Sequence, residues 1–170
     1  MVQVTIRKAL STDIPSIQEI YNQAVRSRLS TCDEDEKSLE DRQKWFEQFN
    51  DSYPLYVLLE DNQVAAYGGL FSYNPRSGYR FAVENTVYVH EKHQRNGHGK
   101  RMLKHVVKVA RELGYTYIEA KIFEHNPVSL KLHEAEGFTI VGVQKDIANL
   151  DGKWFSNVLL ALDLRVYSQV

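Results

Sequence analysis

The 170-residue chain is predicted to fold as an α/β (α+β) protein, with one mixed sheet of about seven strands and helices on both of its faces. Three observations predict this class. Short apolar segments of strand-like alternation recur along the chain, amphipathic segments of helical spacing separate them, and glycine, proline or asparagine marks most boundaries. Neither a linker nor a repeat interrupts the pattern, so we expect a single domain over residues 1–170.

The first half of the chain predicts two helices and four strands. The first helix has cap-forming residues at 11–13 and Pro15 in its first turn. The second helix opens with Ser38 and carries Asp41 three residues later, which is the spacing of a capping box. The strands are expected at 4–10, 55–60, 64–73 and 81–90, and the helices at 11–28 and 38–49.

The strand expected at 81–90 alternates, so that its odd-numbered residues share one face and its even-numbered residues the other. Phe81, Val83, Asn85, Val87 and Val89 fall on the first face, and Ala82, Glu84, Thr86 and Tyr88 on the second. Glu84 is therefore a carboxylate in a strand made mainly of apolar and small residues.

The second half predicts two helices and three strands. The first helix begins at Gly97 and is ended by Gly114, and the second begins at Asn126 and Pro127 and is ended by Gly137. These helices are expected at 97–113 and 126–137, and the strands at 115–123, 138–147 and 153–164, with a turn at 149–152.

Composition excludes several classes of function. The formal net charge is -1, and no basic stripe with interleaved aromatic residues is present, which argues against a nucleic-acid partner. The N-terminal residues lack the apolar core of a signal peptide, and no apolar run reaches membrane-spanning length. Cys32 is the single cysteine, so an internal disulfide is impossible and we interpret this thiol as incidental. A cytoplasmic protein without a membrane partner is the expectation.

Two glycines and several cationic residues at the start of the helix at 97–113 suggest a phosphate site. A helix start presents unpaired N–H groups, and glycine lets a phosphate approach them closely. A Walker A loop is excluded because Arg101 follows Lys100 and Gln94 holds the place of the earlier glycine. A dinucleotide fingerprint is excluded because Met102 holds its third place. Taken alone, this segment fits equally a basic strand-to-helix turn.

Gln94, Gly97 and Gly99 form a Gln-x-x-Gly-x-Gly pattern that resembles the coenzyme A loop of the GNAT acetyltransferase superfamily. The family's second signature is matched downstream by Asn126, Ser129, His133, Gly137 and Phe138. The resemblance covers almost the whole chain. The segments RSGYR, VENTVYVHEKHQRNGHG and GKW are similar to the branch that acetylates phosphinothricin and methionine sulfoximine. The resemblance implies the GNAT fold, with a mostly antiparallel sheet, and acetyl-CoA as co-substrate.

The same resemblance implies the cofactor-binding residues. Backbone groups of the strand at 81–90 are expected to bind the pantetheine, as an added strand would. The loop is expected to hold the pyrophosphate, and the start of the next helix the thioester end, although Asn126 is also explained as a plain N-cap. These residues are Val87, Tyr88, Val89, Gln94, Arg95, Asn96, Gly97, His98, Gly99, Lys100, Asn126 and Ser129.

Glu84 is the predicted catalytic base, because the ammonium group of an amino acid must lose a proton before it attacks a thioester. The alternative is a surface glutamate beside a lysine or arginine. His133 holds the place where many GNAT enzymes have a proton-donating tyrosine, so it is a candidate to protonate or steer the thiolate. An interfacial helix histidine without a catalytic role is the alternative. No metal site is predicted, because no carboxylate or cysteine stands at ligand spacing beside His90 and His93.

The acceptor implied by the resemblance is the α-amino group of a free L-amino acid or an analogue. Its carboxylate needs a cation, for which Arg76 and Arg80 are candidates, and Tyr73 and Tyr79 are candidates for the pocket wall. The resemblance alone implies that the last hairpin helps to close the pocket and that the protein is a homodimer. The alternatives are a coenzyme A-binding sensor or scaffold without turnover, and acetylation of a protein or peptide amine.

Overall fold

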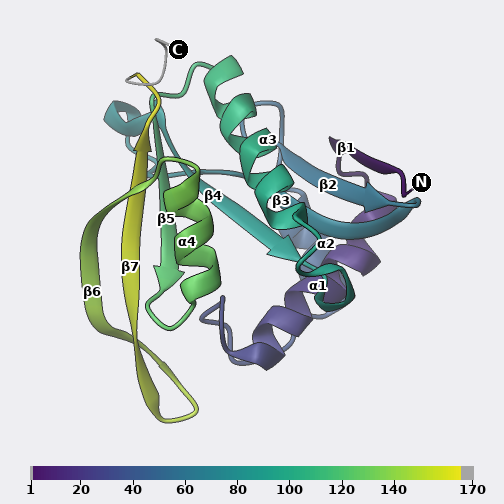
Figure 1. The fold of residues 1–170 in the computed structure, drawn as a ribbon, viewed down its shortest axis with the longest axis horizontal. Coiled ribbons are helices and arrows are strands. Elements are labelled where there is room, and N and C mark those ends of the chain that lie inside the picture. The colour runs from purple at the N-terminus through teal and green to yellow at the C-terminus, as the bar shows by residue number, and fades with distance from the viewer. Residues whose placement is uncertain (1, 166–170) are drawn as a thin grey trace.

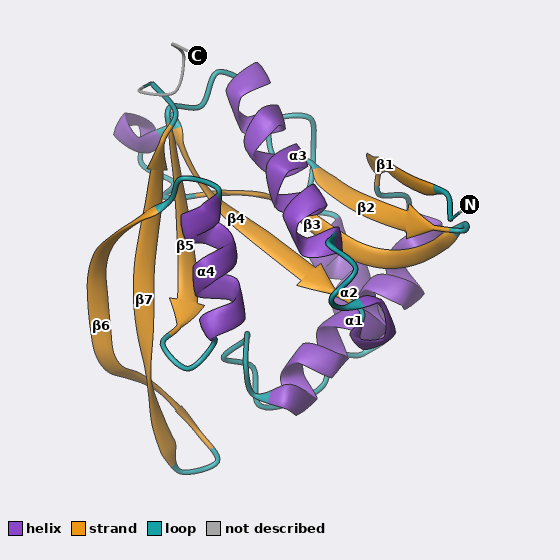
Figure 2. Ribbon diagram, viewed as in Figure 1, coloured by secondary structure: helices purple, strands orange, loops and turns teal. Residues whose placement is uncertain are grey.

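The computed structural model describes residues 2–165, which form a seven-stranded sheet with helices on both faces (Figures 1 and 2). The strands are β1 Val4–Lys8, β2 Leu55–Glu60, β3 Gln63–Ser72, β4 Ala82–Val89, β5 Tyr117–Phe123, β6 Thr139–Leu150 and β7 Lys153–Asp163. The helices are α1 Ile14–Ser27, α2 Leu39–Phe46, α3 His98–Glu112 and α4 Pro127–Ala135, with short 3-10 turns at Ser11–Asp13, Ser77–Tyr79 and Glu91–His93. The predicted fold class and order of elements are confirmed.

The strand order is β1-β2-β3-β4-β5-β7-β6, and every neighbouring pair is antiparallel except β4 with β5. Pairing of β4 with β5 is confined to three residues, from Ala82 with Tyr117 to Glu84 with Glu119. Beyond Glu84 the two strands diverge, as their arrows in Figure 1 show. The divergence leaves one edge of β4 without a strand partner in the middle of the sheet.

Two apolar clusters lie on opposite faces of the sheet. One packs the α3 side chains Met102, Leu103 and Val106 against β4 residues such as Val83. The other joins α1 to the central strands through Ile17, and it includes Trp45 of α2. The predicted alternation of β4 is thereby confirmed, since Val87 and Val89 contact the first cluster and Tyr88 the second.

The boundaries of the elements differ from the expected ones by a few residues. The capping box at the start of α2 is present, because Ser38 Oγ accepts a hydrogen bond from the Asp41 N–H and Asp41 accepts one from the Ser38 N–H. The main difference is in the last hairpin. There β6 runs three residues beyond the expected end, through an irregularity between Gln144 and Ala148, and the turn consists of Asp151 and Gly152.

Candidate active site

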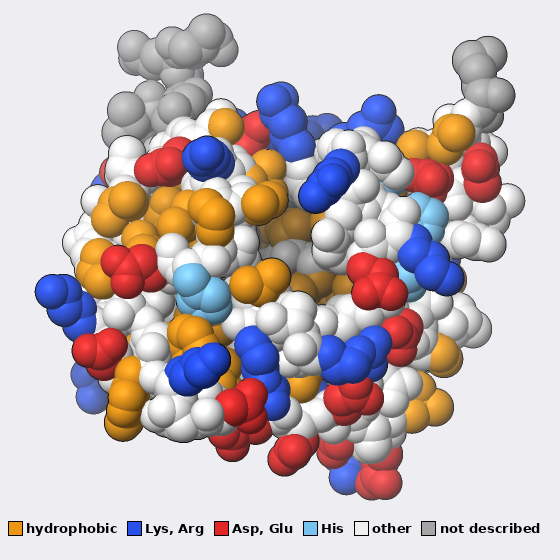
Figure 3. All heavy atoms as spheres, turned by 60° about the horizontal axis from the view of Figure 1, so that its bottom comes forward, with side chains coloured by type: hydrophobic (Ala, Val, Ile, Leu, Met, Phe, Trp, Pro, Cys, Tyr) orange, Lys and Arg blue, Asp and Glu red, His pale blue; other side chains and the backbone are white. Residues whose placement is uncertain are grey.

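A narrow cleft lies where β4 and β5 diverge. It has a volume of about 60 Å³ and is bounded by β4, β5 and the first two turns of α4. Figure 3, which brings the lower side of Figure 1 forward, shows a hollow in this face with hydrophobic side chains inside it. The residues that line the cleft are Ser30, Asn85, Thr86, Val87, Tyr88, Ala120, Lys121, Ile122, Phe123, Asn126, Ser129 and His133.

The β4 edge of this cleft fits an extended polar ligand. From Asn85 to Val89 the backbone of β4 pairs with β3 on one side only. Asn85 Oδ1 is buried and lacks a hydrogen-bond partner among the described residues. A ligand N–H in the cleft would satisfy this oxygen. The predicted role of Val87, Tyr88 and Val89 therefore has a suitable edge in the structure, and Asn85 is a polar group that sequence reasoning missed.

The loop at 94–97 leads into α3 at the open end of β4. Gly97 is the N-cap residue of α3 at φ 78°, and no side chain caps the helix there. A Cβ atom placed on Gly97 would meet nothing within 4 Å, so the space in front of the helix start is open. Such a start binds anions through its free N–H groups. Lys100 is exposed nearby, with its Nζ 3.9 Å from Glu136 Oε1.

The ring of His98 does not point to this surface. It is buried at 2% exposure and binds the carboxylate of Glu60 at the end of β2. His93 Nδ1 lies 3.2 Å from the other oxygen of Glu60. The hydrogen bond from His98, followed by that from His93, lowers the pKa of Glu60. Only the backbone of His98 is thus positioned for the predicted cofactor role.

Glu60, His93 and His98 also bring three possible ligand atoms within 4.8 Å of one another. Sequence spacing did not reveal this group, because Glu60 lies on a different strand. His90, the partner considered for His93, binds Gln23 through its Nε2 at 3.0 Å. Hydrogen bonds between two histidines and one carboxylate account for the cluster.

Glu84 is half-buried at the last position where β4 pairs with β5, and its carboxylate has charged neighbours. Lys121 Nζ lies 2.6 Å from Glu84 Oε1 and 3.8 Å from Glu119 Oε1. Burial, and to a lesser degree the charge of Glu84, raise the pKa of Glu119 against the effect of Lys121. Burial opposes the charge of Lys121 and is the largest single influence, but the hydrogen bond to Glu84 together with the charges of Glu84 and Glu119 outweighs it and raises the pKa of Lys121. Glu84 therefore belongs to a cluster of three charges.

His133 is buried in the wall of the cleft and engaged at both ring nitrogens. Its Nδ1 lies 2.8 Å from the carbonyl oxygen of Ser129, and its Nε2 lies 3.1 Å from Asn85 Nδ2. Burial lowers the pKa of His133, and the Ser129 contact opposes this only partly. A neutral ring that donates from Nδ1 and accepts at Nε2 satisfies both contacts. This arrangement favours a positioning role over proton donation.

Asn126 caps α4 and also joins two parts of the site. Its Oδ1 accepts a hydrogen bond from the Ser129 N–H at 3.2 Å, and its Nδ2 donates to the carbonyl of Leu29 at 3.1 Å. The plain capping role that the sequence left open is therefore observed. Asn126 and Ser129 both line the cleft, so the predicted cofactor contact stays a prediction.

The residues predicted to bind the acceptor lie at the opposite end of β4 from the loop at 94–97. The Tyr73 and Tyr79 rings are 5.5 Å apart. Arg76 is exposed, and Arg80 lies over the ring of Phe81 at 4.5 Å and donates to the Ser77 carbonyl. Tyr73 and Tyr79 thus lie side by side, but none of the four residues lines the cleft or the larger cavity described next, and their predicted roles stay predictions.

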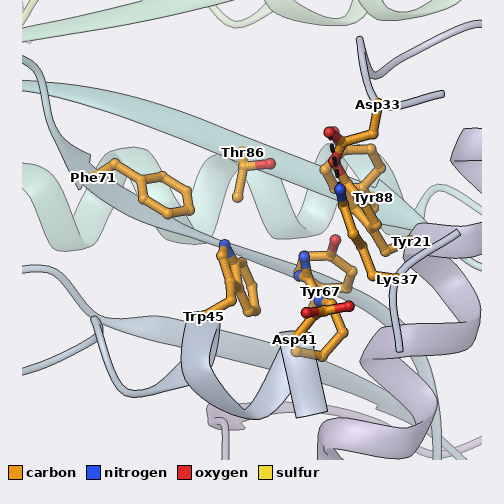
Figure 4. Close-up of a pocket in the computed structure, with 10 residues that line it drawn as sticks. Tyr21, Asp33, Lys37, Asp41, Trp45, Tyr67, Phe71, Thr86 and Tyr88 are labelled. Carbon is orange, nitrogen blue, oxygen red and sulfur yellow. Dashed lines mark hydrogen bonds and ion pairs between the residues drawn. The ribbon is translucent and has the colours of Figure 1, made fainter. Parts of the chain in front are cut away.

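A cavity of about 390 Å³ lies on the other face of β4, under α1 and α2 (Figure 4). Its walls are largely aromatic. The lining residues are Tyr21, Asp33, Lys37, Asp41, Arg42, Trp45, Tyr67, Phe71, Thr86 and Tyr88. Thr86 and Tyr88 also line the cleft, so the two spaces meet at the middle of β4. The segment RQKWF in α2 was the available signal, because Arg42 and Trp45 at helical spacing share one face.

The split between β4 and β5 and the uncapped start of α3 fit an enzyme class that binds a phosphate-bearing ligand. A family model described as Acetyltransferase (GNAT) domain matches residues 6–159, and the chain belongs to this family. The protein is accordingly an acetyltransferase, and the expected use of acetyl-CoA as co-substrate is confirmed at the level of the family.

Three relatives with known names match the chain over most of its length. The L-methionine sulfoximine/L-methionine sulfone acetyltransferase of Salmonella typhimurium is 31% identical and covers 95% of both chains. The L-amino acid N-acyltransferase MnaT of Escherichia coli is 31% identical over 95% of this chain and 94% of its own. The crystal structure of a phosphinothricin acetyltransferase from Sinorhizobium meliloti in complex with AcCoA superimposes with a TM-score of 0.89. It is 30% identical and covers 94% of this chain and 88% of its own.

None of the described helices is long and apolar enough to span a membrane.

Proposed function

We propose that this protein transfers the acetyl group of acetyl-CoA to the α-amino group of a free L-amino acid or an analogue of the methionine sulfoximine or phosphinothricin type. The proposal is carried by the position of Glu84 beside two spaces, because its ion-pair partner Lys121 lines the cleft and its cross-strand partner Phe71 lines the cavity. The cleft between β4 and β5 suits an extended thioester, and the aromatic cavity on the other face of β4 suits a small acceptor. The names of the relatives support an amino-acid acceptor.

The chain's own groups divide the work. The free edge of β4 and the start of α3 bind the donor, whose thioester supplies an activated acetyl group. Among the described residues Lys121 is the group that hydrogen-bonds Glu84, and it does so at Oε1, so Oε2 is available to the acceptor. Glu84 accepts a proton from the acceptor's ammonium group, directly or through a water, and frees the nitrogen lone pair for attack.

The remaining proton movement balances the reaction. As the new C–N bond forms and the C–S bond breaks, the nitrogen loses its second proton and the leaving thiolate gains one. Asn85 and His133 line the cleft on the thioester side and hold each other by a hydrogen bond. They position the sulfur, and the proton that the nitrogen releases reaches it directly or through water.

The test is thiol release from acetyl-CoA with a panel of the twenty amino acids, phosphinothricin, methionine sulfoximine, polyamines and short peptides. We expect turnover with one or a few free amino acids or analogues, and slow turnover by Glu84→Gln. Faster turnover with peptides than with free amino acids would show that the acceptor is a peptide amine and not a free amino acid. Thermal stabilisation by acetyl-CoA without any turnover would leave the donor site intact and overturn the proposed acceptor.

A further inference from the structure

Arg42 is a buried cation whose donors are not all used. Only 4% of the residue is exposed, and both Nε and Nη2 are buried without a hydrogen-bond partner among the described residues. Its guanidinium is stacked over Trp45 at 3.6 Å and over Tyr21 at 4.3 Å from the ring centroids. Buried donors without acceptors are costly, whereas the stacking fixes the plane of the group. The side chain is thus held in place with part of its hydrogen-bonding capacity unfilled.

The carboxylates in the cavity wall do not use the free hydrogen-bonding capacity of Arg42. Asp33 is bound by Lys37, with 3.1 Å between Nζ and Oδ1, and by the hydroxyl of Tyr21. Asp41 accepts hydrogen bonds from the backbone and the hydroxyl of Ser38 in the capping box. In Figure 4 the dashed line joins Asp33 to Lys37 at one side of the cavity. Asp33 is bound at both oxygens and Asp41 at Oδ2, and among the described residues neither carboxylate pairs with Arg42. The hydroxyl of Tyr67, which interacts with Arg42 in this wall, is neutral, so the charge of Arg42 remains available to an anion.

The cavity also connects Arg42 to the reaction. Its opposite wall includes Thr86 and Phe71. Phe71 is the cross-strand partner of Glu84, and Thr86 lies two residues beyond Glu84 on the same face of β4. A molecule that occupies the cavity therefore reaches from Arg42 to the strand that carries the proposed base. The aromatic rings of Trp45, Phe71 and Tyr88 suit an apolar or thioether group.

We infer that Arg42 binds the α-carboxylate of the acceptor, and that the aromatic cavity accepts an apolar or thioether side chain. The inference rests on the proposed function and deepens it. A guanidinium donates charge-assisted hydrogen bonds to a carboxylate, and the buried setting strengthens the pair. The carboxylate then fixes the acceptor, and its amino group is directed toward β4.

The first arm of the test uses the wild-type enzyme and changes the substrate. L-Methionine is compared with L-methioninamide and with 3-(methylthio)propylamine, which lacks the carboxylate. We expect kcat/KM to fall by about 100-fold or more for both compounds, because each leaves the buried cation unpaired. Equal use of the three compounds would overturn the inference. This arm does not depend on the folding of a variant.

The second arm compares Arg42→Gln and Arg42→Lys with Lys44→Gln, an exposed control on the same helix. We expect Arg42→Gln to raise KM for L-methionine by about 100-fold while kcat/KM for the propylamine and KM for acetyl-CoA change by less than about threefold. Lys44→Gln should behave as wild type. An equal loss with both acceptors, or a carboxylate-specific loss in Arg80→Gln instead, would overturn the assignment to Arg42.

The outcomes for the two proposals are distinguishable. If wild type acetylates no amino acid, the proposed function fails and the inference fails with it. If wild type acetylates amino acids without regard to the carboxylate, only the inference fails. Thermal unfolding of each variant, with and without acetyl-CoA, shows whether its fold and donor site are intact.

Discussion

Lys121 of β5 holds Glu84 of β4 across the point where the two strands separate, with 2.6 Å between Nζ and Oε1. We expect Glu84→Gln to lower kcat/KM for the amino acid by about 100-fold or more, with a small change in KM for acetyl-CoA. Steady-state kinetics with both substrates checks this. A loss confined to KM for acetyl-CoA would assign Glu84 to donor binding instead.

Lys121→Met would leave Glu84 facing the buried Glu119 without a cation between them. Burial already raises the pKa of Glu119, and the lost lysine would raise it further. The pKa of Glu119 is then higher in the folded state than in the unfolded state. The folded state therefore loses stability as pH rises from the unfolded pKa to the folded pKa, and the loss persists at higher pH. Thermal unfolding should therefore show a larger destabilisation of the variant at pH 7 than at pH 5. Equal destabilisation at both values would contradict this account.

Gly97→Ala separates backbone strain from ligand binding. Gly97 and Gly114 lie at opposite ends of α3 with φ of 78° and 83°, and a Cβ on either meets nothing within 4 Å. Each alanine should destabilise the fold by about 1 kcal/mol, because both positions are left-handed. Only Gly97→Ala should also raise KM for acetyl-CoA, through a methyl group where the phosphates approach. Calorimetric binding of coenzyme A is the readout, and equal binding by the two variants would exclude a role for this loop.

His133 provides a test of proton donation. Burial lowers the pKa of His133 in the folded state, so on acidification this histidine is protonated in the unfolded chain before it is protonated in the folded one. Stability therefore falls as pH drops below about 6.5. His133→Gln should make this acid loss shallower. It should raise KM for acetyl-CoA through Asn85, but leave the shape of the kcat–pH profile unchanged. Disappearance of the alkaline limb in the variant would instead identify His133 as the general acid.

The outer edge of the sheet suggests an assembly surface. β6 is an edge strand, and five large apolar residues on the hairpin of β6 and β7 are exposed, which is unusual for a monomer. They are Ile140, Val141, Val143, Ile147 and Trp154. We expect a homodimer of twice the 19.7 kDa chain mass in light scattering, and a monomer after Val143→Glu. A wild-type monomer at the concentrations used for assays would contradict the prediction.

Sequence patterns predicted the fold because local signals agreed with the tertiary structure. The Ser38 capping box and the alternation of β4 each depend on residues that lie close together in the sequence, and both are present. The alternative of a lysine or arginine beside Glu84 is observed in Lys121. The sequence could not identify Lys121 and Glu119 as the partners, because they reach Glu84 through the pairing of strands far apart in sequence. The aromatic cavity under α1 and α2 was missed for the same reason. Arg42 appears in the sequence as one more charged residue of a surface helix, and only its burial between rings distinguishes it.

The short pairing of β4 with β5 has a kinetic consequence. Among the described residues, the half-sheets β1–β4 and β5–β7 share no backbone hydrogen bonds beyond Glu84, and side-chain packing, including the α3 cluster, spans the gap. Glu84 lies on one half and Lys121 on the other, so any opening of the gap also alters the environment of the proposed base. A donor in the gap would lock both halves together. We therefore expect an ordered sequence, in which acetyl-CoA binds first and prepares the base before the amino acid arrives.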